Sequence, residues 1–263
     1  MFTIYKHEMK GYIKSLVIWA SCVGGMGAVC ILLFSSMQES MEGMSESFAS
    51  MGAFADAFGM SQLSIATLKG FYATEVGTIH GLGGAMFAAV ASANMLSKEE
   101  DGHTSEFLFS LPVGRGKVVL AKWLAVASNI FLFNLLCVGL YLLSISFLGE
   151  EMDFQNFLLY HAMQLLMQLE MAGICFCLSA FQKKNKLGIA LGIVLFLYAY
   201  DMMARVIPDL VDYKLLSPFS YANAADLFST GEIYAKAAAL GTAVLAACVA
   251  AAHAVYRNKD LAV

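Results

Sequence analysis

The chain has 263 residues, of which 59% are hydrophobic and only 14% are charged, and its net charge is −4. Soluble domains carry about 25% charged residues, so this composition excludes an ordinary soluble enzyme and indicates a protein that lies in the lipid bilayer. We expect no nucleic acid among its partners. The apolar stretches are long and do not alternate with polar residues, which favours transmembrane helices over a β-barrel.

Six apolar runs are each long enough to cross a bilayer, which requires about 20 residues. The predicted spans are 16–34, 76–97, 123–149, 154–182, 187–207 and 237–256. The predicted fold class is therefore all-α, a polytopic membrane protein with six transmembrane helices in a single domain over residues 15–263.

The first 14 residues carry Lys6, Lys10 and Lys14 at four-residue spacing, so on a helix the three lysines share one face. Apolar residues lie between them. We interpret residues 1–14 as an amphipathic elbow helix that lies on the inner membrane surface and is anchored by these lysines. The alternative is a basic flank that only follows the positive-inside rule.

The distribution of basic residues predicts the orientation. Most of the 16 Lys and Arg residues lie on one side of the predicted spans, the side that holds both termini and residues 97–117. Cytoplasmic loops carry an excess of Lys and Arg, so we expect that side to be cytoplasmic and the loops 35–74 and 208–236 to be extracellular. The expected location is a cell membrane, which the chain crosses several times.

Five polar side chains in the third and fourth predicted spans are candidates for a substrate path. Glu170 lies near Gln164 and Gln168, which share a helix face, and Asn129 and Asn134 could be their partners. Ionisable groups inside a membrane are functional candidates by default. Interhelical hydrogen bonding explains the same residues equally well.

Asp201 and Arg205 are four residues apart in the fifth predicted span, so they can pair on one helix face. We expect this pair to be structural. If the pair is functional instead, the alternative is a secondary transporter or channel that is coupled to ions through Glu170 and Asp201.

Three glycines in the second predicted span, Gly77, Gly81 and Gly84, recur at three- and four-residue spacing. Such a face lets helices approach closely, either within one chain or across a dimer. The six cysteines all lie in apolar runs without metal-ligand spacing, so we predict no metal site.

The usual catalytic motifs are absent from the sequence. The stretch GRGKV resembles the end of a phosphate-binding loop, but Val118 replaces the hydroxyl residue that such a loop requires. HExxH and GxSxG do not occur either. We therefore expect no catalytic residues, no cofactor in this chain and no enzymatic activity of its own.

The most polar stretch, SKEEDGHTSEFLFSLPVGRGK at residues 97–117, stands between two of the most apolar runs. It resembles the inner loop of permease subunits of ABC transporters in the ABC-2 (type V exporter) class, roughly E-x-G-T-x-E-x-L-x-S-x-P-x-x-R and then a Lys. The residues that match are Glu100, Gly102, Thr104, Glu106, Leu108, Ser110, Pro112, Arg115 and Lys122. His103 departs from the pattern by one inserted residue.

The resemblance implies a permease subunit of an ATP-driven exporter. Its partners would be two copies of a separate ABC ATPase, which binds ATP and Mg, and a second permease that is identical or paralogous. In that family the loop forms a coupling helix that docks on the ATPase. The ATPase-coupling residues implied here are Glu99, Glu100, Asp101, Glu106, Phe107, Leu108, Phe109 and Leu111.

We expect the three acids of this loop to be exposed to the cytoplasm, and Arg115 and Lys117 to anchor the loop at the lipid headgroups. The alternative is a solvated loop without a partner. A mostly apolar path suits a hydrophobic, amphipathic or peptide-like cargo.

Overall fold

The computed structural model describes residues 1–105 and 113–259, apart from a few side chains between residues 45 and 49, and every regular element among them is helical. The predicted all-α fold class is confirmed. The long helices are α1 (Phe2–Ala49), α4 (Gly77–Ser92), α7 (Arg115–Leu148), α8 (Phe154–Phe181), α9 (Leu187–Val206) and α11 (Ala235–Asn258). The short ones are α2 (Ala53–Phe58), α3 (Leu68–Phe71), η1 (Tyr72–Val76), α5 (Lys98–Asp101), η2 (Pro208–Leu216), η3 (Pro218–Ser220) and α10 (Ala224–Thr230).

Five of these helices are long and apolar enough to cross a membrane, namely α1 over Phe2–Met44, α7, α8, α9 and α11. Large apolar side chains are exposed on their outer faces, and Phe147 of α7 is 83% exposed. A water-soluble surface would not carry so many of them together. The protein is therefore a multi-pass membrane protein.

The predicted second span has a different construction from the other five. The chain is helical from Leu68 to Ser92 in three pieces, α3, the π-helical η1 and α4, so no single α-helix there reaches the length of a span. The Thr74 hydroxyl donates to the Gly70 carbonyl at 3.0 Å, and such a bond competes with the backbone ladder. The described residues thus contain five candidate spans, whereas six were predicted.

The N-terminal residues do not form a separate element, because α1 runs without a break from Phe2 to Ala49. Lys6, Lys10 and Lys14 are exposed, as expected for one polar face, whereas Glu8 is only 2% exposed. The predicted extracellular loop is also largely helical at its start, since α1 continues beyond residue 35.

Local signals explain how α7 gives way to α8. Helix α7 ends at Leu148 and is followed by Gly149, whose φ of 73° lies in the left-handed region that favours glycine. Asp153 then caps α8 by accepting a hydrogen bond from the Asn156 amide at 3.3 Å. A short turn of this kind makes the two long helices antiparallel neighbours.

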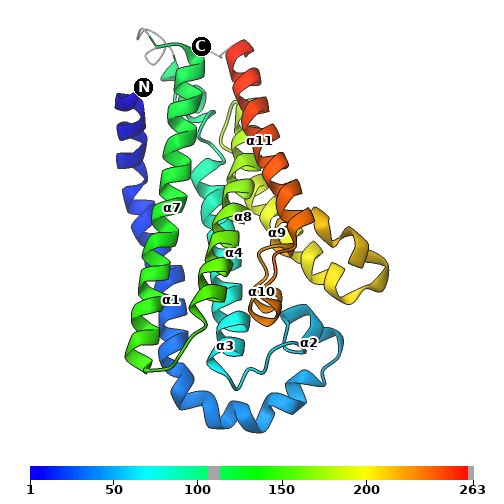
Figure 1. Cartoon of the computed structure of the whole chain (residues 1–263). Coiled ribbons are helices and arrows are strands. Elements are labelled where there is room, and N and C mark those ends of the chain that lie inside the picture. Colours follow the sequence, from blue (N-terminus) through cyan, green and yellow to red (C-terminus); the bar gives the residue numbers. More distant parts are fainter. Residues whose placement is uncertain (106–112, 260–263) are drawn as a thin grey trace.

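Helix α8 lies at the centre of the bundle, with 61% of its most apolar stretch buried, against 11% for α11. Helices α4, α7 and α11 all pack against it (Figure 1). Polar side chains of α8 consequently lie inside the bundle, where their hydrogen-bond partners come from the neighbouring helices and loops.

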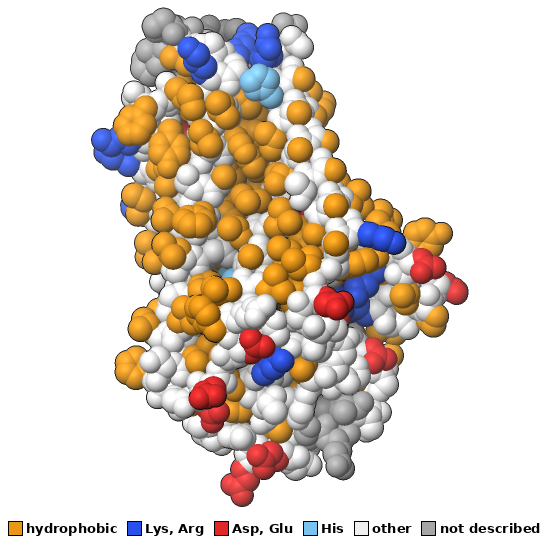
Figure 2. Space-filling model, in the orientation of Figure 1, with side chains coloured by type: hydrophobic (Ala, Val, Ile, Leu, Met, Phe, Trp, Pro, Cys, Tyr) orange, Lys and Arg blue, Asp and Glu red, His pale blue; other side chains and the backbone are white. Residues whose placement is uncertain are grey.

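The two ends of the molecule differ in charge. Both termini and the start of α7 lie at one end, while α2, α3 and α10 lie toward the other (Figure 1). Figure 2 shows Lys and Arg side chains near the terminal end, Asp and Glu side chains together with some Lys and Arg toward the opposite end, and a broad apolar band between them. This distribution matches a helix bundle whose middle lies in lipid.

Candidate functional site

A buried polar cluster joins three helices in the middle of the bundle. Asn134 of α7 donates from Nδ2 to Gln168 Oε1 of α8 at 2.7 Å, and its Oδ1 lies 3.1 Å from His80 Nε2 of α4. The three side chains are 6%, 0% and 0% exposed. Two of the predicted path residues are therefore brought together, and their contacts are interhelical hydrogen bonds.

The bonds of Asn134 determine which nitrogen of His80 carries hydrogen. The amide nitrogen of Asn134 also donates to the Ile130 carbonyl at 2.9 Å, so its oxygen must be the acceptor facing His80. His80 Nε2 is then the donor. Its Nδ1 lies 3.3 Å from the Tyr141 hydroxyl, which donates to the Val23 carbonyl at 3.4 Å, so the ring of His80 contacts α7 on both of its sides.

A second histidine lies beside this cluster. His161 Nε2 is 2.8 Å from the Tyr72 hydroxyl, and the His80 and His161 rings are 5.0 Å apart. Neither His161 nor Tyr72 was predicted from the sequence as part of a site. His161, Gln164 and Gln168 follow a spacing of three and four residues, which places them on one face of α8, so this face could have been extended to His161.

Glu170 lies away from these amides, on the side of α8 that contacts α11. Its Oε2 accepts a hydrogen bond of 2.7 Å from the Tyr221 hydroxyl. A methyl group at Gly241 of α11 would lie 2.3 Å from the same oxygen, so glycine is needed there for the pair to fit. Burial raises the pKa of the Tyr221 phenol, and the neighbouring Glu170 carboxylate raises it further, so the phenol remains a donor.

The remaining path candidates have separate partners. Asn129 donates to the Ala125 carbonyl at 2.8 Å and contacts Met9 Sδ of α1 at 3.3 Å. Gln164 donates to the Ala222 carbonyl at 2.7 Å. The five predicted residues thus belong to four environments within the bundle and do not form one continuous patch.

The three predicted packing glycines all face other parts of the same chain. A Cβ atom at Gly84 would lie 2.2 Å from Gln168 Nε2, and one at Gly81 would lie 3.3 Å from Gln164 Nε2. One at Gly77 would lie 2.7 Å from the Cβ of Ala224. These glycines allow α4 to approach α8 and α10 closely.

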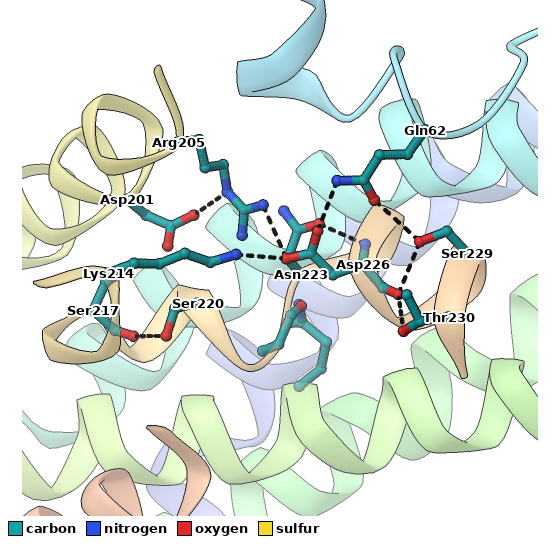
Figure 3. A network of polar contacts seen from close by, with 12 residues as sticks. Gln62, Asp201, Arg205, Lys214, Ser217, Ser220, Asn223, Asp226, Ser229 and Thr230 are labelled. Carbon is teal, nitrogen blue, oxygen red and sulfur yellow. Dashed lines mark hydrogen bonds and ion pairs between the residues drawn. The ribbon is translucent and has the colours of Figure 1, made fainter. Parts of the chain in front are cut away.

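The predicted pair of Asp201 and Arg205 is confirmed, with 2.8 Å between Arg205 Nε and Asp201 Oδ2. Arg205 also reaches Asp226 of α10 at 3.0 Å, and Lys214 reaches the same carboxylate at 2.9 Å (Figure 3). Burial raises the pKa of Asp226, but the charges of Arg205 and Lys214 outweigh it and leave that pKa below its ordinary value. The network connects α9, η2 and α10.

Lys122 of α7 is the centre of a second charge network, at the end that holds the termini. Its side chain is 0% exposed, and its Nζ donates to the Met95 carbonyl at 2.8 Å and to Glu99 at 2.6 Å. The same nitrogen lies 3.2 Å from Glu8 of α1, which also pairs with Lys98. We call Glu8, Lys98, Glu99 and Lys122 the inner ion cluster.

The acids of α5 bind other parts of the chain. Glu100 pairs with Lys259 at 2.6 Å and is only 4% exposed, so its expected exposure is wrong. Asp101 is exposed and accepts from the Asn185 amide at 3.2 Å. Burial of Glu100 follows from the approach of the C-terminal end of α11, which sequence spacing alone does not indicate.

The other predicted coupling and anchor residues divide into two groups. Arg115 is half-buried and donates to the Lys259 carbonyl at 2.7 Å, while Lys117 is exposed. The coupling residues Glu106, Phe107, Leu108, Phe109 and Leu111 lie outside the described residues. The described part of this segment is therefore tied to α1, α7, the loop after α8 and the C-terminal end of α11.

Comparison with known proteins identifies the family. A search of curated proteins found no match. A family model described as ABC-2 family transporter protein matches residues 2–261, nearly the whole chain. The protein therefore belongs to the ABC-2 transporter family and is a membrane permease subunit of an ABC transporter.

Proposed function

We propose that the chain is the permease subunit of an ATP-driven exporter with six membrane crossings, in which η1 and α4 together provide the second. Both termini and α5 face the cytoplasm, and α2, α3 and α10 face outward. The excess of Lys and Arg at the terminal end supports this orientation (Figure 2). The membrane is a bacterial inner membrane, and the cargo is hydrophobic, amphipathic or peptide-like.

Energy reaches the permease through α5 and the residues that follow it. A separate ATPase, with its own ATP and Mg, docks on this segment. The observation that carries the proposal is the inner ion cluster, because Lys122 joins α5 to both α1 and α7 through buried ion pairs. A displacement of α5 by the ATPase would therefore be transmitted to two long helices.

The complex contains two ATPase subunits and a second permease, identical or paralogous. The anchors Lys6, Lys10, Lys14, Arg115 and Lys117 hold the inner end at the lipid headgroups. Family membership favours ATP over an ion gradient acting through Glu170 and Asp201 as the energy source.

Affinity purification of the tagged chain in mild detergent tests the proposal. We expect an ABC ATPase to co-purify, and the eluate to hydrolyse ATP. A chain that elutes repeatedly without an ATPase, and that shows gradient-driven flux by itself in liposomes, would contradict the proposal and support the secondary transporter.

A further inference from the structure

A small cleft opens between α2, α4 and α9, toward the end of the molecule opposite the termini. It encloses about 40 Å³ of water-accessible space, more than the roughly 10–15 Å³ that a single water requires. The partly exposed residues of its wall are apolar or aromatic for the most part. They are Phe58, Thr78, Leu82, Tyr198, Met202 and Asn223.

Two buried polar side chains line this cleft, each with one oxygen that has no hydrogen-bond partner among the described residues. They are Gln164 of α8 and Asp201 of α9, each 2% exposed. Gln164 Nε2 donates to the Ala222 carbonyl, which identifies Oε1 as the unpaired acceptor. Asp201 Oδ2 accepts from Arg205, so Oδ1 is unpaired.

An unpaired buried acceptor destabilises a protein, whereas a ligand that supplies a donor relieves that cost. Two such acceptors on one cleft call for a group with at least two hydrogens to donate. A primary ammonium has three, and one of the two acceptors is a carboxylate. An amide or hydroxyl group has fewer donor hydrogens than an ammonium, and, being neutral, it is not attracted by the charge of the carboxylate.

The charges around the cleft also favour a cation. Asp201 and Asp226 balance Arg205 and Lys214, so the network itself repels neither sign. Exposed acids, including Asp56 of α2, lie toward the same end, where Figure 2 shows Asp and Glu side chains. A negative field at the mouth of a cleft raises the local concentration of cations.

We infer that this cleft binds the primary ammonium end of an amphipathic cargo, with Gln164 Oε1 and Asp201 Oδ1 as acceptors. The apolar wall formed by Phe58, Leu82 and Met202 contacts the carbon chain next to the ammonium. The inference rests on the proposed export function and narrows the substrate class to amphipathic amines.

Binding of hexylamine to the full chain in lipid nanodiscs tests this site, with empty nanodiscs measuring partition into the bilayer. Hexylamine is charged at pH 7, as lysine is. Two probes of similar shape are compared with it, hexanol, which has no charge, and hexyltrimethylammonium, which has the charge but no donor hydrogens. We expect saturable binding of hexylamine that is roughly tenfold or more tighter than that of either comparison probe.

Two variants on different helices alter the acceptors. Gln164→Met removes the acceptor oxygen, and Asp201→Asn removes the negative charge and, because Arg205 holds its remaining oxygen, places an amide NH2 at the position of Oδ1. Each should weaken hexylamine binding by roughly tenfold, as for loss of one hydrogen bond to a charged group. Asp226→Asn is the matched control, because it makes the same chemical change in the same network but does not line the cleft. It should change binding by about twofold or less. Size-exclusion chromatography and circular dichroism check that each variant folds.

Equal binding of the three probes, or absence of saturable binding, would overturn the ammonium site even if both variants misfold. Unchanged binding in folded variants would overturn it as well. ATPase co-purification is measured on the same preparations. If the ATPase co-purifies but hexylamine does not bind, only the ammonium site is overturned. If hexylamine binds but no ATPase co-purifies, the proposed function is overturned and the ammonium site stands.

Discussion

Lys122 of α7 and Glu99 of α5 form an ion pair of 2.6 Å at a position where the lysine side chain has no exposed surface. The lysine that the family pattern places after the inner loop thus contacts that loop directly. Glu8 of α1 completes the contact from a third helix. The described acids Glu99 and Glu100 consequently connect α5 to other parts of the chain at the end that holds the termini.

Lys122→Met should destabilise the end that holds the termini, because it leaves the buried Glu8 carboxylate with one partner fewer and Glu99 without its cation. Loss of one member of a buried ion pair costs about 3–5 kcal/mol. A lower temperature of thermal inactivation in detergent is the readout. The double variant Glu8→Gln/Lys122→Met should recover part of the loss, and the exposed Lys117→Met should have little effect. Equal effects at Lys117 and Lys122 would refute the inner ion cluster.

Asp101→Lys should weaken ATPase association without preventing membrane insertion, because Asp101 is the exposed acid of α5. Reversal at Glu99 or Glu100 would also break an internal ion pair, so those variants would test stability and docking together. The amount of ATPase in a pull-down, normalised to the permease, is the measurement. Asp209→Lys, an exposed acid at the opposite end, is the control. Undiminished association in Asp101→Lys would count against docking at α5.

Acid should weaken the network of Asp201, Arg205, Lys214 and Asp226, because it protonates Asp226. Its pKa is lowered in the folded protein, so its stabilising contribution is complete above the unfolded pKa of about 3.9 and is lost as the pH falls through the lower folded value. The temperature of thermal inactivation is measured from pH 6 downward. Below about pH 4 it should fall less steeply with pH in Asp226→Asn than in the wild type. Identical acid dependence would show that Arg205 and Lys214 do not stabilise this carboxylate.

Gly84→Ala should destabilise the bundle, because the new methyl group would lie 2.2 Å from Gln168 Nε2 and would push α4 away from α8. Overpacking of this kind costs about 1–3 kcal/mol. Gly188→Ala in α9 is the matched control, since nothing lies within 4 Å of its Cβ position. It should be neutral or stabilising by up to about 1 kcal/mol. If both variants behave alike in thermal inactivation, the close approach at Gly84 is absent.

Patterns that depend on neighbouring residues were predictable from the sequence. The apolar runs correctly placed α1, α7, α8, α9 and α11, because the length of a membrane crossing is set by the bilayer. The pairing of Asp201 with Arg205 follows from helix geometry over four residues. The shared face of Gln164 and Gln168 follows from the same rule.

Features that depend on long-range packing were not predictable. Glu100 and Lys259 are far apart in the sequence, and nothing local to either indicates that the C-terminal end of α11 covers α5. Glu170 is two residues from Gln168, yet its partner, Tyr221, comes from the segment between η3 and α10. The π-helical η1 was not predicted either. Hydropathy indicates how long an apolar segment is, but it does not indicate which backbone groups pair within the helix.

Reconstitution into liposomes tests the central claim most directly. The purified chain is incorporated with and without the co-purified ATPase, and movement of a bound small molecule identified by mass spectrometry is followed. The account predicts transport that requires both the ATPase and ATP with Mg, and no transport by the chain alone under an ion gradient. Gradient-driven transport by the chain alone, unchanged by the ATPase and ATP, would contradict it.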